Sequence, residues 1–130
     1  MTTFKEVYEK FKCNKTDAAV ARKANLNKTT LSRIIRELIP ANRNYLWSLC
    51  FALELNLNQS EELFDAAGIH MNRSYHMSER EKDCEKFLKE CINKKQYNVI
   101  ELNVELYGMG YQLFGNQTYT KHSYTGCAFF

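Results

Sequence analysis

The sequence predicts an all-α fold: a five-helix domain followed by a small helical C-terminal region and an aromatic tail. Three observations predict it. Apolar residues recur at helical spacing along the chain up to about residue 107. Residues that commonly cap helices, such as serine, threonine and asparagine, precede most of these segments. Glycine follows two of them, at Gly68 and in the sequence GMG at 108–110, where we expect a helix to stop.

The first three helices are short. The first is indicated by four apolar residues with i, i+3, i+4, i+7 spacing, namely Phe4, Val7, Tyr8 and Phe11. Asn14 and Thr16 are caps for a second helix over about residues 17–24. A third helix opens at a further cap, Asn27, and its apolar stripe is formed by Leu31, Ile34, Ile35 and Leu38.

The next two helices complete the predicted domain. Pro40 suits a loop or a first helical position rather than a helix interior. A fourth helix is expected over about residues 42–55, with an apolar face of Leu46, Leu49, Cys50 and Leu53. The sequence NQSEELFDAAGI predicts a capped fifth helix that ends at Gly68.

The remaining chain divides into a linker, two helices and a tail. Residues 70–77 lack periodicity and are predicted to link residues 1–69 to residues 78–130. Ser78 and Glu81 form a capping box for a sixth helix. Asn98 caps a seventh, with Ile100, Val104 and Tyr107 on one side and Leu102 and Leu106 near them. The tail over 111–130 is compatible with a strand pair, an arm that docks on a partner, or a partly disordered segment.

Charge is distributed unevenly along the 130 residues. Residues 1–47 carry ten Lys and Arg against four Asp and Glu, a net charge of +6. Residues 48–130 carry eight against eleven, a net charge of −3. Such a split favours a basic working surface on the first half and a different role for the second. Without an apolar segment of about 18 residues or a signal peptide, the chain is expected to be cytoplasmic, with no membrane contact.

The sequence does not favour an enzyme or a metal protein. The five cysteines are irregularly spaced and lack CxxC pairs, so we expect reduced, mostly buried thiols, no metal site and no cofactor. No nucleophile or phosphate-binding motif is present, and the carboxylates are scattered over polar helix faces. We therefore expect no catalytic residues.

Residues 20–38 have the pattern of a helix-turn-helix, because two short helices are separated by about three residues. Ala21 and Ala24 are small enough to let the two helices cross closely. Asn25 tolerates the left-handed backbone that the turn requires, and Leu26 is expected to fill the core between the helices. Asn27 then caps the second helix.

The sequence VARKANLNKTTLSRIIREL resembles the helix-turn-helix of the Xre type, the family of lambda-like phage repressors and Cro proteins. The resemblance extends over the five predicted helices of residues 3–68, about half of the chain. The chain departs from the family pattern at Asn25, where glycine is usual, and from Glu37 to Pro40, where a glycine-bearing loop is frequent. The resemblance implies a five-helix fold that binds DNA.

The residue chemistry of the third helix independently favours DNA binding. An α-helix fits the major groove, and its N-terminal residues reach the base edges. Lys28 and Arg33 can donate to guanine, while Thr29 and Ser32 can donate to or accept from bases. Residues at the starts of the second and fourth helices suit phosphates. The resulting candidates for DNA contact are Lys15, Lys28, Thr29, Thr30, Ser32, Arg33, Arg36, Asn42, Arg43 and Asn44.

We therefore expect a sequence-specific regulator of transcription from a bacterium or phage that binds double-stranded DNA as a homodimer. Residues 78–130 are expected to make the dimer contact or to bind a protein partner. The alternative is a small phage-type inhibitor of a host or defence enzyme that is built on a helix-turn-helix scaffold. Aromatic residues of the tail favour this alternative, because partners bury such side chains: Tyr119, Tyr124, Phe129 and Phe130.

Overall fold

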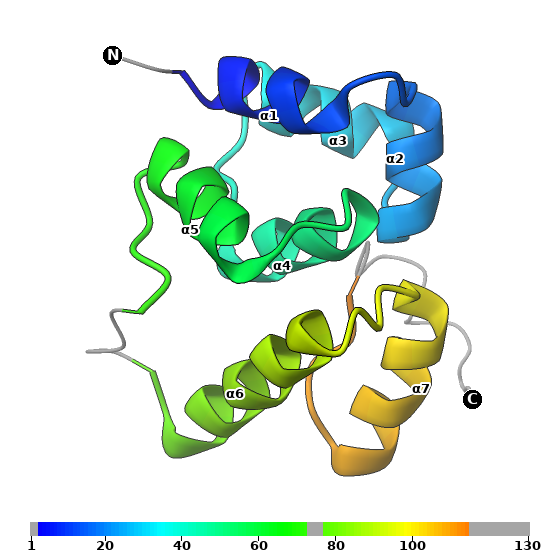
Figure 1. Ribbon diagram of the computed structural model, residues 1–130, viewed down its shortest axis with the longest axis vertical. Helices are drawn as coiled ribbons and strands as arrows, with labels where there is room; N and C mark the ends of the chain where they lie inside the picture. Colours follow the sequence, from blue (N-terminus) through cyan, green and yellow to red (C-terminus); the bar gives the residue numbers. More distant parts are fainter. Residues whose placement is uncertain (1–2, 73–76, 115–130) are drawn as a thin grey trace.

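A computed structural model describes residues 3–72 and 77–114 (Figure 1). These residues form seven α-helices without a β-strand, which confirms the predicted all-α class. No helix among them is long and apolar enough to cross a lipid bilayer. The helices are α1 (Phe4–Lys12), α2 (Asp17–Ala24), α3 (Lys28–Ile35), α4 (Arg43–Ala52), α5 (Leu57–Ala66), α6 (Glu79–Asn93) and α7 (Val99–Met109).

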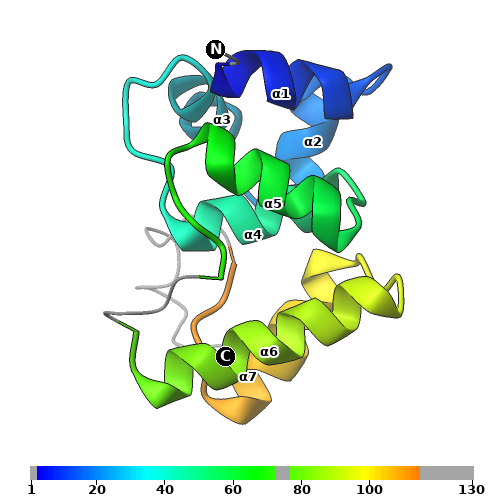
Figure 2. The same ribbon diagram turned by 60° about the vertical axis from the view of Figure 1, so that its left-hand side comes forward.

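The helix α4 lies at the centre of the molecule. It contacts α2, α5 and α7, and every side chain from Leu46 to Ala52 is buried. Figures 1 and 2 show α1, α2 and α3 on one side of α4 and α5, with α6 and α7 on the other. One core of buried apolar side chains runs through all seven helices, from Phe4 in α1 to Leu106 in α7. The N-terminal and C-terminal halves are therefore joined by packing as well as by the chain.

Side-chain caps begin every helix among the described residues. The predicted caps Thr16, Asn27, Ser78 and Asn98 are confirmed. The cap of α5 differs from the prediction, because Asn56 rather than a residue of the segment NQSEELFDAAGI begins the helix. Its Oδ1 accepts from Gln59 N at 2.8 Å, and Gln59 Oε1 accepts from Asn56 N at 3.0 Å. This reciprocal pair satisfies two N–H groups at once.

Several helices end on a residue with left-handed backbone, and most of these residues are not glycine. Asn25 has φ 59° and ψ 38°, as predicted. Glu37 has φ 58° and lies two residues after the end of α3, in the segment where the Xre-type pattern often has a glycine-bearing loop. There the N–H groups of Glu37 and Leu38 donate to the carbonyls of Ile34 and Arg33, at 3.0 and 2.8 Å. This bonding pattern satisfies the last carbonyls of a helix.

The predicted apolar stripe of α3 does not match the structure at Leu38, and the apolar side predicted for α7 faces away from the core. Since α3 ends at Ile35, Leu38 does not continue its buried stripe and is 60% exposed. In α7 the buried face contains Val99, Leu102 and Leu106, whereas Ile100 and Val104 are 71% and 69% exposed. The predicted linker is described only at 70–72 and 77, and the tail only at 111–114; the tail residues from 115 onward lie outside the described residues.

A buried tyrosine joins α1 to α2. The Tyr8 hydroxyl donates to Asp17 Oδ1 at 2.8 Å, and Lys12 Nζ lies 3.0 Å from the same oxygen. Burial, followed by the bond to Asp17, raises the pKa of Tyr8, so its phenol remains protonated and donates. Burial alone would raise the pKa of Asp17, but the bonds from Lys12 and Tyr8 outweigh it and lower that pKa below its usual 3.8.

We expect Tyr8→Phe to lower the free energy of unfolding by about 1 kcal/mol at neutral pH, because one hydrogen bond to a charged acceptor is lost. Asp17 has a lowered pKa in the folded state, so its stabilising effect is present above its unfolded pKa and is lost as the pH falls through the folded value. The difference in the free energy of unfolding between the natural chain and the Tyr8→Phe variant should therefore become smaller as the pH falls. Urea unfolding across this pH range measures it, with Tyr111→Phe as the matched control; equal losses in both variants would contradict the role of the Tyr8 hydroxyl.

Candidate nucleic-acid interface

The turn between α2 and α3 sets the direction in which α3 leaves the core. It consists of three residues. Asn25 is left-handed, Leu26 is 6% exposed and fills the core, and Asn27 accepts from Thr30 N at 2.9 Å. The N–H of Leu26 donates to Ala21 O at 2.9 Å, which closes the end of α2. The roles that the sequence predicted for these turn residues are therefore confirmed.

The helix α3 has one buried and one exposed face. Leu31, Ile34 and Ile35 are at most 6% exposed and anchor the helix in the core. Four of the predicted DNA-contact residues are exposed on the opposite side: Lys28, Thr29, Arg33 and Arg36. Thr30 and Ser32 are half-buried at its flank. The structure thus brings six of the ten predicted residues together on one short helix and its C-terminal cap.

These side chains border a shallow hollow, here called the α3 surface, which is lined by Lys28, Thr29, Ser32, Arg33, Arg36 and Leu38. No carboxylate belongs to this lining. Among the residues that the structure describes, neither Lys28 nor the two arginines form an ion pair or a hydrogen bond through their side chains. The charge of Lys28 does contribute to the lowered pKa of Asp17, after larger effects of burial, Lys12 and Tyr8. The α3 surface therefore presents three cations, two hydroxyls and one apolar side chain to solvent.

The α3 surface lies away from the C-terminal helices. In both ribbon views α4 and α5 separate α3 from α6 and α7 (Figures 1 and 2). Within the described residues, α7 packs against α4 and α6 packs against α5. Helices α6 and α7 therefore leave the exposed side of α3 accessible to a large partner.

At the start of α4 the structure corrects the prediction for Arg43. Its guanidinium binds both carboxylate oxygens of Glu85 in α6, at 2.5 and 2.6 Å. It also donates to the carbonyls of His70 and Met71, at 3.1 and 2.6 Å, and lies over the ring of Phe64. Only 23% of the Arg43 side chain and 14% of the Glu85 side chain are exposed. Arg43 is thus a joint between α4 and α6, with four of its donors already used, rather than a group available to phosphate.

The remaining predicted contacts, Lys15, Asn42 and Asn44, have three different environments. Asn44 donates through its amide to Leu113 O at 3.0 Å, so it holds the C-terminal segment instead of facing solvent. Asn42 caps α4 by accepting from Tyr45 N at 2.9 Å and is exposed. Lys15 is half-buried just before α2 and apart from the α3 surface. The phosphate contacts predicted at the starts of α2 and α4 therefore do not line the α3 surface.

Sequence reasoning missed Leu38 and the role of Asn44. Leu38 was expected in the core, and only the left-handed residue before it moves it to the α3 surface. The separation of Arg43 from Glu85 by 42 positions left no local pattern to predict their pair.

Comparison of the chain with models of protein families, with curated proteins and with solved structures finds no match. The interpretation of this surface therefore depends on its own residues.

We expect Arg43→Met to lower the free energy of unfolding by about 2–3 kcal/mol, because charged hydrogen bonds are lost and the Glu85 carboxylate stays partly buried. Urea unfolding provides the measurement. Arg36→Met, which removes an exposed guanidinium from the α3 surface, is the matched control and should change stability by less than about 0.5 kcal/mol. Similar small effects in both variants would show that the Arg43 joint does not stabilise the fold.

Proposed function

We propose that α1 to α5 form an Xre-type helix-turn-helix domain, that α3 enters the major groove of double-stranded DNA, and that the protein regulates transcription in a bacterium or phage. The observation that supports this most is the α3 surface: three cations outside any described ion pair and two hydroxyls, exposed on a helix whose other face is anchored in the core. Such a helix matches the width of the major groove, and its donors match the edges of bases.

The α3 surface has the side chains that base recognition needs. Lys28 and Arg33 would donate to O6 and N7 of guanine, and Thr29 and Ser32 would bond to neighbouring bases. Leu38 adds an apolar contact that suits the methyl group of thymine. Arg36, Thr30, Asn42 and Lys15 are then the candidates for phosphates, which position the helix without reading sequence.

A homodimer is the second part of this proposal, since two copies would read two half-sites about 34 Å apart. The exposed apolar face of α7 supports it, because Ile100 and Val104 lie one helical turn apart and are 71% and 69% exposed. This face is self-complementary around Val104. In an antiparallel pair of α7 helices Val104 meets its own copy, and Ile100 meets Gly108, beside which a side chain would find open space. Contacts of this reciprocal kind are those of a two-fold dimer.

The protein-binding alternative gains no support from the structure. It depends on Tyr119, Tyr124, Phe129 and Phe130, which lie outside the described residues. Its test is capture of a host enzyme by the full chain, with measurement of whether that enzyme is inhibited.

We expect selection from random duplex DNA to yield a palindromic consensus, and Arg33→Ala to weaken binding to that consensus by about 1–3 kcal/mol with relaxed preference at one base of each half-site. The physical reason is the loss of a bidentate donor to guanine. Fluorescence anisotropy with the consensus duplex and with single-base variants measures both effects.

Arg22→Ala is the matched control, because Arg22 is an exposed arginine that borders a hollow shared with Tyr97 and Ile100 rather than the α3 surface. It should leave base preference unchanged. If the selection enriches no sequence, or if Arg33→Ala and Arg22→Ala bind every duplex as the natural chain does, α3 does not read DNA.

We expect Val104→Glu to convert the dimer to a monomer, since two carboxylates would face each other across the two-fold axis. Light scattering over a concentration series provides the mass. Glu105→Gln, an exposed change on the adjacent position of α7, should leave the mass unchanged. A chain that is already monomeric at the concentrations at which it binds DNA would exclude the dimer while leaving the α3 proposal standing.

A further inference from the structure

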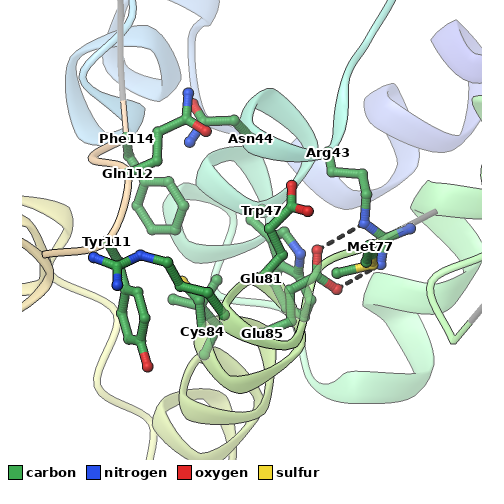
Figure 3. Close-up of a pocket in the computed structure, with 12 residues that line it drawn as sticks. Arg43, Asn44, Trp47, Met77, Glu81, Cys84, Glu85, Tyr111, Gln112 and Phe114 are labelled. Atoms are coloured by element: carbon green, nitrogen blue, oxygen red, sulfur yellow. Dashed lines mark hydrogen bonds and ion pairs between the residues drawn. The ribbon is translucent and has the colours of Figure 1, made fainter. Parts of the chain in front are cut away.

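A cavity of about 230 Å³ lies between the start of α4, the first half of α6 and the segment 111–114 (Figure 3). Its wall is mainly apolar, with Trp47, Cys84, Leu88, Tyr111 and Phe114 among the lining residues. The cavity therefore opens between the predicted DNA-binding half of the chain and its C-terminal half. None of its lining residues belongs to α3.

One polar atom of the wall has no partner. Trp47 is 2% exposed, and its indole N–H is buried without a hydrogen-bond acceptor in the part of the chain that the structure describes. Figure 3 shows the indole among the lining side chains, with its nitrogen toward α6. A buried donor without an acceptor is destabilising, and such groups in a native fold call for an explanation. An acceptor supplied by a molecule in the cavity would remove this cost.

The other charged groups of the wall are already compensated. Arg43 and Glu85 neutralise each other through two hydrogen bonds. Arg80 donates to the Gly110 carbonyl and lies over the ring of Tyr111, and Glu81 accepts from Ser78 N. Since these two side chains also have opposite charges, the wall has no excess charge that would select an ion. A neutral molecule fits this electrostatic environment best.

The size of the cavity and the aromatic groups of its wall suggest the shape of that molecule. A protein cavity of about 150 Å³ is large enough for benzene, so 230 Å³ allows one ring with a short substituent. The rings of Trp47, Tyr111 and Phe114 favour contact with another aromatic ring. Ligand sites commonly combine such an apolar wall with a few polar groups that fix orientation.

We propose that this cavity is a binding site for a neutral, single-ring aromatic molecule with a hydrogen-bond acceptor, and that the indole N–H of Trp47 donates to that acceptor. This inference goes beyond the proposed DNA-binding function and does not depend on it. Its ligand would contact α4 and α6 together, on both sides of the joint that Arg43 and Glu85 form.

The test uses two probes of the same shape, acetophenone and α-methylstyrene, of which only the first has an acceptor oxygen. Trp47 is the single tryptophan of the chain, so its indole N–H gives one resonance in a proton–nitrogen correlation spectrum of the full-length protein. Acetophenone should move that resonance downfield and saturably. α-Methylstyrene should bind about tenfold more weakly and should cause no downfield shift, because it offers the indole no acceptor.

Two variants of a lining residue provide the matched comparison. Cys84→Phe places a ring in the cavity and should lower the affinity for acetophenone at least about tenfold. Cys84→Ala leaves the space open and should bind acetophenone more tightly than Cys84→Phe does, which separates filling of the cavity from loss of the thiol. Circular dichroism verifies that both variants keep their helices, and the comparison of the two probes on the natural chain holds even where a variant does not fold. The absence of saturable binding, or equal binding of both probes, would overturn the proposal, since the indole N–H would then not contribute to binding.

Discussion

The bidentate pair of Arg43 and Glu85 fixes how the two halves of the molecule meet. An ion pair with both side chains less than a quarter exposed loses much of its hydration, and it stabilises only if its hydrogen-bonding groups find partners. Here Glu85 offers both oxygens, and two backbone carbonyls after α5 accept further N–H groups of Arg43. Arg43 thereby holds three parts of the chain together: the start of α4, residues 70–71 after α5, and the middle of α6. The cavity beside Trp47 lies at the same point, because Arg43 and Glu85 both line it.

A second constraint comes from asparagine amides that hold the segment 111–114. Asn25 and Asn103 both donate to Phe114 O at 3.1 Å, and Asn44 donates to Leu113 O at 3.0 Å. Because Asn25 is also the left-handed residue of the turn before α3, the C-terminal segment is bonded directly to the turn that directs α3. Phe114 is 3% exposed and packs on Phe51 of α4, with ring centroids 5.7 Å apart. The segment 111–114 is thus an integral part of the core on which the α3 surface is built.

Local chemistry explains which features could be predicted from the sequence. A cap, a capping box or a left-handed asparagine is decided within about four residues, so Asn27, Ser78 and Asn25 were predicted correctly. Helical spacing does not indicate which side of α7 is buried, because Ile100 and Val104 satisfy it as well as Leu102 and Leu106 do. The neighbouring helix decides which pair faces the core. The role of Arg43 depends on a carboxylate 42 positions away, which periodicity does not locate.

The starts of α3 and α4 show why an external anion suits the α3 surface. Both helices have a basic first residue, Lys28 and Arg43, and neither has an acidic residue in its first turn. A cation at this end opposes the helix dipole, which favours negative charge there. At α4 the chain supplies the anion itself, since Glu85 binds Arg43. At α3 no carboxylate among the described residues pairs with Lys28, Arg33 or Arg36. In the proposed complex with DNA, the phosphates that border the groove would provide the negative charge that α3 lacks, as Glu85 provides it for α4.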